Sequence, residues 1–175
     1  RRRKSVGRVI EPAGIKCPSV VRPGMDEALA VFDENGIELL AEAGELAAGV
    51  DAHLTVLALM TEDEFDQVAE TLDAVAQEEH TGYGSGTVLD AAKQEAREAV
   101  REHYDDLDLE WDVTGTVISD QGAAADGILE TAEEAGADHV FLTGRQRSPT
   151  GKAVFGDRAQ AVILNFDGPV TTLLD

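Results

Sequence analysis

A loop rich in glycine and basic residues is the part of the sequence best suited to bind an anion. The segment GRQRSPTGKAVFGD, at 144–157, follows an apolar run at 139–143 and precedes a helical pattern at 157–165. Glycine lets backbone N–H groups approach an anion, and the first turn of a helix adds free N–H groups and a favourable dipole. Arginine can pair with phosphate oxygens in a bidentate manner. The segment predicts an anion site, with a plain strand-to-helix turn as the alternative.

The distribution of charge favours the anion site. Residues 1–24 hold seven of the 14 basic residues and one of the 35 acidic ones, which leaves seven basic and 34 acidic residues in 25–175. Four of those seven basic residues lie at 145, 147, 152 and 158. Asp157 opposes the site, because we expect its carboxylate to cap the helix and occupy the N–H groups that a phosphate would use. A like charge at about 4 Å also costs about 1 kcal/mol in water.

Other motifs for catalysis or metal binding do not fit. Six residues separate Gly144 from Gly151, and Ala153 replaces the hydroxyl residue, so the segment is not a phosphate-binding P-loop. Cys17 is the only cysteine and the four histidines are isolated in sequence, so we expect no metal cluster. Asp120, after Ser119, is typical of a helix-capping turn, with a catalytic role as the alternative. The glycine-rich break at 80–86 is either a plain connector or a lid.

The elements that must position the loop alternate between strands and helices. Apolar runs predict strands at 28–32, 53–59, 139–143 and 168–174, and alternation with period 2 predicts a strand nearer the sheet edge at 109–119. Helical spacing predicts helices at 37–48, 63–79, 89–103, 125–135 and 157–165. This alternation requires a parallel, doubly wound α/β sheet of five strands with helices on both faces. Ligands of such sheets bind beyond the carboxyl ends of the strands, where Asp33 and the 144–157 loop both lie.

Composition limits the partners of the chain. The body from 25 to 175 is so acidic that it repels nucleic-acid backbones and anionic membranes, and we expect neither as a partner. No window is long and apolar enough for a membrane span, so we expect a cytoplasmic protein. Dense carboxylates with little lysine are typical of salt-accumulating halophiles, with an ordinary acidic protein as the alternative.

Residues 1–24 differ from the rest of the chain in charge and pattern. They contain three prolines and no sustained periodicity, so we expect a basic, disordered extension to a domain at 25–175. Met25 is a candidate for the natural start. The alternative is a basic arm that folds back on the acidic domain or binds an anion.

Two segments resemble the universal stress protein family. VFDENGIELLAEAGELAAGVDAHLTVLAL resembles its opening, and AEEAGADHVFLTGRQRSPTGKAVFGDRAQAVILNFDGPVTTL resembles its close, especially in members from halophilic archaea. The resemblance covers about 25–175 and implies an adenine-nucleotide-hydrolase-like fold with strand order 3-2-1-4-5. It also implies a homodimer through the last strand. The ligand contacts that it implies are Val31, Asp33, Leu59, Thr143, Gly144, Arg145, Arg147, Gly156, Asp157 and Arg158.

The sequence departs from the family motif, Gly-x2-Gly-x9-Gly-(Ser/Thr), at three points. Arg147 replaces the second glycine, the spacing from Gly144 to Gly156 is one residue short, and Asp157 replaces the hydroxyl residue. These changes favour AMP or another adenine ligand of low charge over ATP.

Three functions remain open from the sequence. The first is a stress-response or regulatory protein that binds an adenine nucleotide and hydrolyses ATP slowly at most. The second is a nucleotide-free dimeric interaction module in which Asp157 caps the last helix. The third is an enzyme acting on adenylated substrates, for which the sequence lacks additional phosphate-binding motifs.

Overall fold

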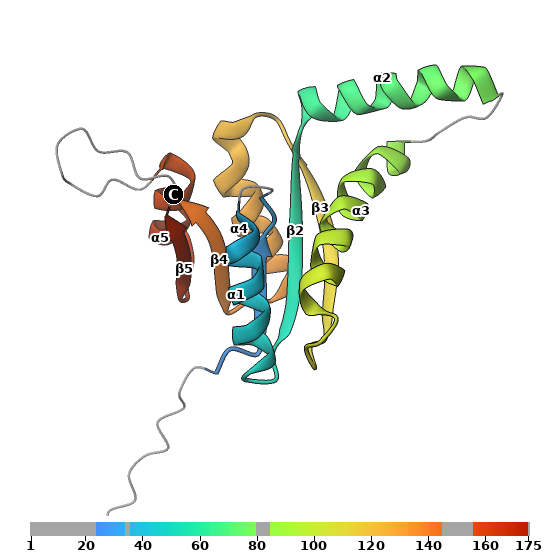
Figure 1. Cartoon of the computed structure of the whole chain (residues 1–175). Helices are drawn as coiled ribbons and strands as arrows, with labels where there is room; N and C mark the ends of the chain where they lie inside the picture. The colour runs from blue at the N-terminus through green and yellow to red at the C-terminus, as the bar shows by residue number, and fades with distance from the viewer. Residues whose placement is uncertain (1–23, 34–35, 80–84, 145–155, 175) are drawn as a thin grey trace, which may run out of the picture.

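The computed structural model describes residues 24–33, 36–79, 85–144 and 156–174. Its elements follow the alternation expected from the sequence (Figure 1). The strands are β1 (Glu27–Val31), β2 (His53–Thr61), β3 (Trp111–Ile118), β4 (His139–Gly144) and β5 (Val170–Leu174). The helices are α1 (Ile37–Ala48), α2 (Glu62–Glu79), α3 (Ser85–Tyr104), η2 (Gln121–Ala123), α4 (Ala124–Ala135) and α5 (Asp157–Asn165).

The five strands form one parallel sheet in the order β3-β2-β1-β4-β5. The predicted fold class and strand order are therefore confirmed. β1 pairs with both β2 and β4, so the chain reverses its direction of winding between β1 and β4. The carboxyl ends of these central strands meet there, at the end of the sheet that leads from β2 into α2 (Figure 1).

Successive residues of the central strands pack into two cores, one on each face of the sheet. On β1, Ala28 and Ala30 belong to the core under α1 and α3, whereas Leu29 and Val31 belong to the core under α4 and α5. Because neighbouring side chains on a strand point to opposite faces, an unbroken apolar run is what two covered faces require.

α1 and α3 are held together by a buried tyrosine. The Tyr104 hydroxyl, at the end of α3, donates a hydrogen bond of 2.5 Å to the Leu40 carbonyl oxygen in α1. The ring lies against Gly44, where a Cβ atom would collide with it. Burial raises the pKa of the Tyr104 phenol above its usual range, so the hydroxyl remains a donor at all ordinary pH values.

α2 differs from the expectation of a helix packed on the core. It runs away from the end of β2, past the edge of the sheet (Figure 1). Phe65, Val68 and Leu72 are only half-buried, and no side chain described in this helix is buried. The apolar spacing predicted the helix, but amphipathicity alone cannot say how much of the apolar face the rest of the molecule covers. None of the described helices is both long and apolar enough to cross a membrane.

A candidate nucleotide site at the sheet switch point

Asp33 lies two residues beyond β1, at the carboxyl end of the sheet. A turn holds it there, because the Gly36 N–H donates a hydrogen bond of 2.8 Å to the Asp33 carbonyl oxygen. A Cβ atom on Gly36 would collide with Cγ2 of Thr143 at the end of β4. Glycine at this position therefore lets the turn after β1 lie directly against β4.

The side chains of Asp33, Thr143 and Arg158 form a connected polar network, named here the switch-point triad. Thr143 Oγ1 donates to Asp33 Oδ2 at 3.0 Å and accepts from Arg158 Nη2 at 2.9 Å. Arg158 Nη2 also lies 3.5 Å from Asp33 Oδ2. The triad joins the turn after β1, the end of β4 and the first turn of α5, which is the meeting point that the sequence predicted.

A cleft of about 1210 Å³ opens beside this triad. Asp33, Thr143 and Arg158 line it, and further walls come from β2, α2, α3 and the turn at Gln121. Drug-sized ligands commonly occupy pockets of about 300–1,000 Å³, so the cleft has room for a nucleotide. Its position at the carboxyl ends of β1, β2 and β4 is where open α/β sheets bind ligands.

The structure places most, though not all, of the predicted ligand contacts on this cleft. Leu59, Gly144 and Gly156 line it together with the triad. Val31 is only 4% exposed and packs in the core under α4 and α5, and it is not among the lining residues. Arg145 and Arg147 lie outside the described residues.

The prediction that Asp157 caps the last helix is wrong. Gly156 occupies the N-cap position, with extended backbone angles of φ −59° and ψ 154°, and no side chain caps this end. Asp157 is instead the first helical residue, and it lines the cleft. Since a helix boundary depends on the backbone angles of one residue, the sequence preference of aspartate for the cap position did not settle it. The first-turn N–H groups of α5 are thus not occupied by a side-chain cap.

Sequence reasoning missed the contribution of α2 and α3 to the cleft. Glu64 and Val68 of α2 and Ala91, Ala92 and Glu95 of α3 all line it. The sequence did carry one signal, Thr61-x-x-Glu64, which is a capping box. Glu64 Oε2 accepts from the Thr61 N–H at 2.8 Å and from Thr61 Oγ1 at 2.9 Å, and the Glu64 N–H donates to Thr61 Oγ1 at 3.2 Å.

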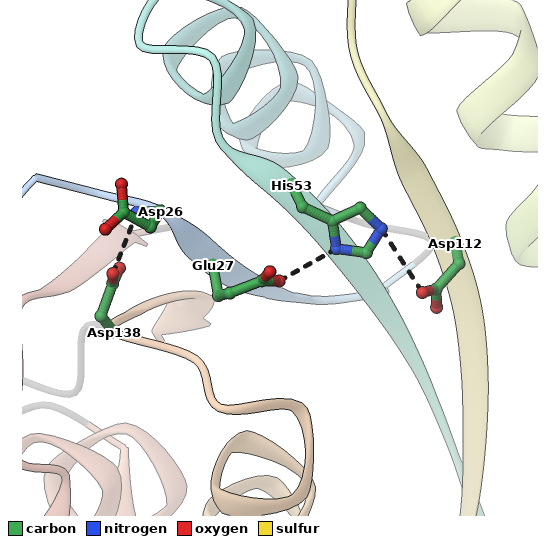
Figure 2. A network of polar contacts seen from close by, with 5 residues as sticks. All are labelled: Asp26, Glu27, His53, Asp112 and Asp138. Atoms are coloured by element: carbon green, nitrogen blue, oxygen red, sulfur yellow. Dashed lines mark hydrogen bonds and ion pairs between the residues drawn. The ribbon is translucent and has the colours of Figure 1, made fainter.

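A second polar cluster lies at the opposite, amino-terminal end of the sheet (Figure 2). His53 Nδ1 lies 3.1 Å from Glu27 Oε2, and His53 Nε2 lies 3.5 Å from Asp112 Oδ2, so one imidazole connects β1, β2 and β3. Beside it, Asp138 Oδ2 accepts from the Asp26 N–H at 2.9 Å. The described ranges hold no group of three or more histidine, cysteine or acidic side chains that could hold a metal ion. The cluster therefore connects the amino-terminal ends of neighbouring strands.

Comparison with known proteins agrees with the fold. The model of the universal stress protein family matches residues 28–173, which is most of the chain. This chain belongs to the universal stress protein family. No curated protein sequence matches the chain significantly.

Solved structures of universal stress proteins have the same fold at low sequence identity. The protein from Archaeoglobus fulgidus is 20% identical, with a TM-score of 0.53 over 85% of this chain and 97% of its own. UspA from Lactobacillus plantarum is 16% identical, with a TM-score of 0.54 over 85% and 97%. A universal stress protein solved in complex with cAMP is 14% identical, with a TM-score of 0.57 over 86% and 98%. Identities this low establish the common fold, not a common ligand.

Proposed function

We propose that this universal stress protein is a regulatory protein of the stress response that binds an adenine nucleotide in the switch-point cleft. The observation that carries the proposal is the switch-point triad, which brings an acid, a hydroxyl and a cation together beside a cleft of nucleotide size. Carboxylates and hydroxyls suit the hydroxyl groups of a ribose, and a guanidinium suits a phosphate. A family member of the same fold was solved in complex with cAMP, which supports an adenine ligand.

The charge of the cleft favours a ligand of low charge, such as AMP, over ATP. Among the described lining residues, four are acidic and one is basic: Asp33, Glu64, Glu95, Asp157 and Arg158. Each carboxylate near a triphosphate adds repulsion that grows as water is excluded. The basic residues at 145, 147 and 152 lie outside the described residues. We further propose that the protein acts by binding, with ATP hydrolysis slow at most.

The nucleotide-free interaction module is the less favoured reading of the same region. It required Asp157 to cap α5 and so to occupy the N–H groups of the first turn. The structure places Asp157 inside the helix instead, with Gly156 at the cap position. No side chain of the described residues caps the first turn of α5, which supports a function that binds a phosphate there.

We also propose an oligomeric state and a cellular environment for the protein. We infer a homodimer through β5, because this strand is at the edge of the sheet and an edge strand offers unpaired backbone groups. A net charge of −21 supports a halophilic origin, in which molar salt screens the surface carboxylates. The cytoplasmic location and the domain boundary at residue 25 remain predictions from the sequence.

Titration with nucleotides at about 2–3 M KCl tests the proposed function. We expect AMP to raise the melting temperature of the full chain, and more than ATP does at equal concentration. A ligand present at about 100 times its dissociation constant stabilises the folded state by about 2.7 kcal/mol. Guanosine monophosphate serves as the control for the base. If AMP, cAMP, ADP and ATP all leave the melting temperature unchanged, the protein does not bind adenine nucleotides and the interaction module becomes the better explanation.

A further inference from the structure

We propose that a groove at the amino-terminal end of the sheet binds a small organic ammonium ion, such as a short diamine. The groove is separate from the switch-point cleft, because the two have no described lining residue in common. The inference is therefore independent of the proposed nucleotide function. It arises from a buried hydroxyl without a partner and from carboxylates that line the same groove.

The groove lies between the β3 side of the sheet and the last turns of α4. One side comes from β2 and β3 through Thr55 and Thr114, and the other comes from α4 through Thr131 and Ala135. Thr55 is on the same face of β2 as Leu57, which packs in the core under α4 and α5. The groove thus continues this core toward the amino-terminal ends of the strands, with polar residues in place of apolar ones.

Thr55 is the residue that indicates a ligand. The polar residues buried in the described part of the chain are Thr55, Thr61 and Thr131. Thr61 Oγ1 donates to Glu64 Oε2 at 2.9 Å, and Thr131 Oγ1 donates to the Gly127 carbonyl oxygen at 2.8 Å. Thr55 is only 6% exposed, yet within the described residues its hydroxyl has no such partner. Because buried hydroxyls normally have a hydrogen-bond partner, this one is suited to bind a ligand.

The Thr55 hydroxyl is reached through the groove. Among the described residues, the side-chain polar atom that is both fully buried and without a partner is Asp138 Oδ1. Thr55 Oγ1 is not such an atom, so it keeps some contact with solvent, and the groove that Thr55 lines provides that contact. A ligand in the groove can therefore form a hydrogen bond with Thr55.

Carboxylates line the groove around this hydroxyl, and none of its described lining residues is a lysine or an arginine. Glu27 and Asp112 share the imidazole of His53, at 3.1 and 3.5 Å (Figure 2). Glu110 and Glu134 line the groove too, and within the described structure their side chains have no hydrogen bond or ion pair. A cation in the groove is therefore attracted by two carboxylates that have no other partner there.

The chemistry of the groove favours an organic ammonium ion over an anion or a metal ion. The carboxylates repel an anion, and the described ranges hold no group of histidine, cysteine or acidic side chains that could bind a metal. An ammonium group has three N–H donors, so it can donate to a hydroxyl and to a carboxylate at once. The volume of about 480 Å³ suits a small ligand. In a short diamine, one ammonium group donates to Thr55 while the other pairs with a carboxylate.

The test measures the dissociation constant of 1,4-diaminobutane for the full chain, by calorimetry at one fixed KCl concentration. We expect Thr55→Val, which replaces the hydroxyl with a methyl group, to weaken binding at least about tenfold, the size of one hydrogen bond to a charged group. Thr55→Ser keeps the hydroxyl and should bind within about threefold of the unchanged protein. 1,4-Butanediol, which has the same length without the charge, should not bind.

Two variants on α4 distinguish the groove from the general acidity of the surface. Glu134→Gln removes a lining carboxylate and should weaken the binding of 1,4-diaminobutane at least about threefold. Glu133→Gln is the matched control, because Glu133 is an exposed neighbour that does not line the groove, and it should leave the dissociation constant within about twofold. Equal losses in the two variants would show that the diamine is attracted only by the acidic surface, and would overturn the inference.

The stability of Thr55→Val separates a ligand-binding hydroxyl from a structural one. Without the diamine, its melting temperature should be no lower than that of the unchanged protein, because a hydroxyl without a partner is lost at no cost in hydrogen bonds. A lower melting temperature would give the hydroxyl a structural role and overturn the inference. Unchanged diamine affinity in Thr55→Val, or no binding to the unchanged protein, would do the same. Each of these results leaves the proposed nucleotide function intact.

Discussion

His139 shows how the surroundings of one side chain decide its role. It begins β4, its Nε2 lies 2.9 Å from Thr171 Oγ1 in β5, and its ring stacks on Phe141 with 4.5 Å between ring centroids. Burial lowers the pKa of the His139 imidazole from its ordinary value of 6.5, and the nearby charge of Asp138 opposes this only in part. Contacts of this kind between neighbouring strands give His139 a structural role.

The first prediction concerns the dependence of stability on pH. Because the pKa of His139 is lower in the folded than in the unfolded protein, the unfolded chain binds more protons at pH values below about 6.5. The contribution of His139 to the free energy of unfolding is therefore present above pH 6.5 and falls as the pH drops below it. Urea denaturation of His139→Gln between pH 7.5 and 5 should show a shallower loss of stability than the unchanged protein. Equal or steeper loss in the variant would contradict this.

At the scale of elements, the ends of helices decide what each loop can do. Asp120 caps the turn that leads into α4, since its Oδ1 accepts from the Gly122 N–H at 2.6 Å and from the Ala123 N–H at 3.3 Å. The prediction of a capping turn after β3 is confirmed. α5 begins instead at a glycine, with no side-chain cap. The start of η2 is thus closed by a carboxylate, whereas no side chain caps the start of α5 beside the cleft.

The second prediction concerns the cap at Asp120. Asp120→Ala removes the acceptor for two N–H groups and should lower the free energy of unfolding by about 0.5–2 kcal/mol, measured by urea denaturation. Asp120→Asn keeps an acceptor without the charge and should be close to neutral, which separates capping from charge repulsion. Ser119→Ala, at an exposed neighbouring position, is the matched control and should change stability by less than about 0.5 kcal/mol. Equal effects of the alanine and asparagine variants would point to charge, not capping.

At the scale of the whole molecule, the order of the strands sets both the site and the free edges. β1 and β4 lie side by side, which creates the switch point, and β3 and β5 lie at the two edges. β5 carries Leu174, which is 40% exposed, and the neighbouring α5 carries Leu164, which is 71% exposed. Exposed apolar side chains beside an unpaired edge strand support an interface between copies of the chain.

The third prediction concerns this interface. Leu174→Glu should shift the protein from twice the mass of one chain toward a single chain, measured by light scattering at about 2 M KCl, because it places a charge in the proposed contact. Leu46→Glu is the control, since Leu46 is 46% exposed but lies on α1. A dimer that survives in Leu174→Glu, or that is lost equally in Leu46→Glu, would place the interface elsewhere.

Most of the fold could be predicted from local patterns in the sequence, and less of the site. The apolar runs and helical spacings located every strand and long helix to within a few residues. Because unbroken apolar strands must be covered on both faces, they also predicted helices on both faces of the sheet. Asp33, Thr143 and Arg158 were also among the predicted contacts. Glu64 and the α3 residues were not, since they reach the cleft only through the direction in which α2 and α3 leave the sheet. Val31 was predicted as a contact, although its side chain packs into the core.

The sequence by itself determined the alternation of strands and helices, the acidic surface and the residues available for an anion site, because these follow from composition and from periods of two and 3.6 residues. Only the tertiary structure decided that Asp157 is helical and not a cap. The tertiary structure also decided that one nitrogen of Arg158, Nη2, contacts both Thr143 and Asp33. A helix start depends on the backbone angles of single residues. A contact between positions 33 and 158 depends on how two strands pair across more than a hundred residues, and no local pattern encodes either.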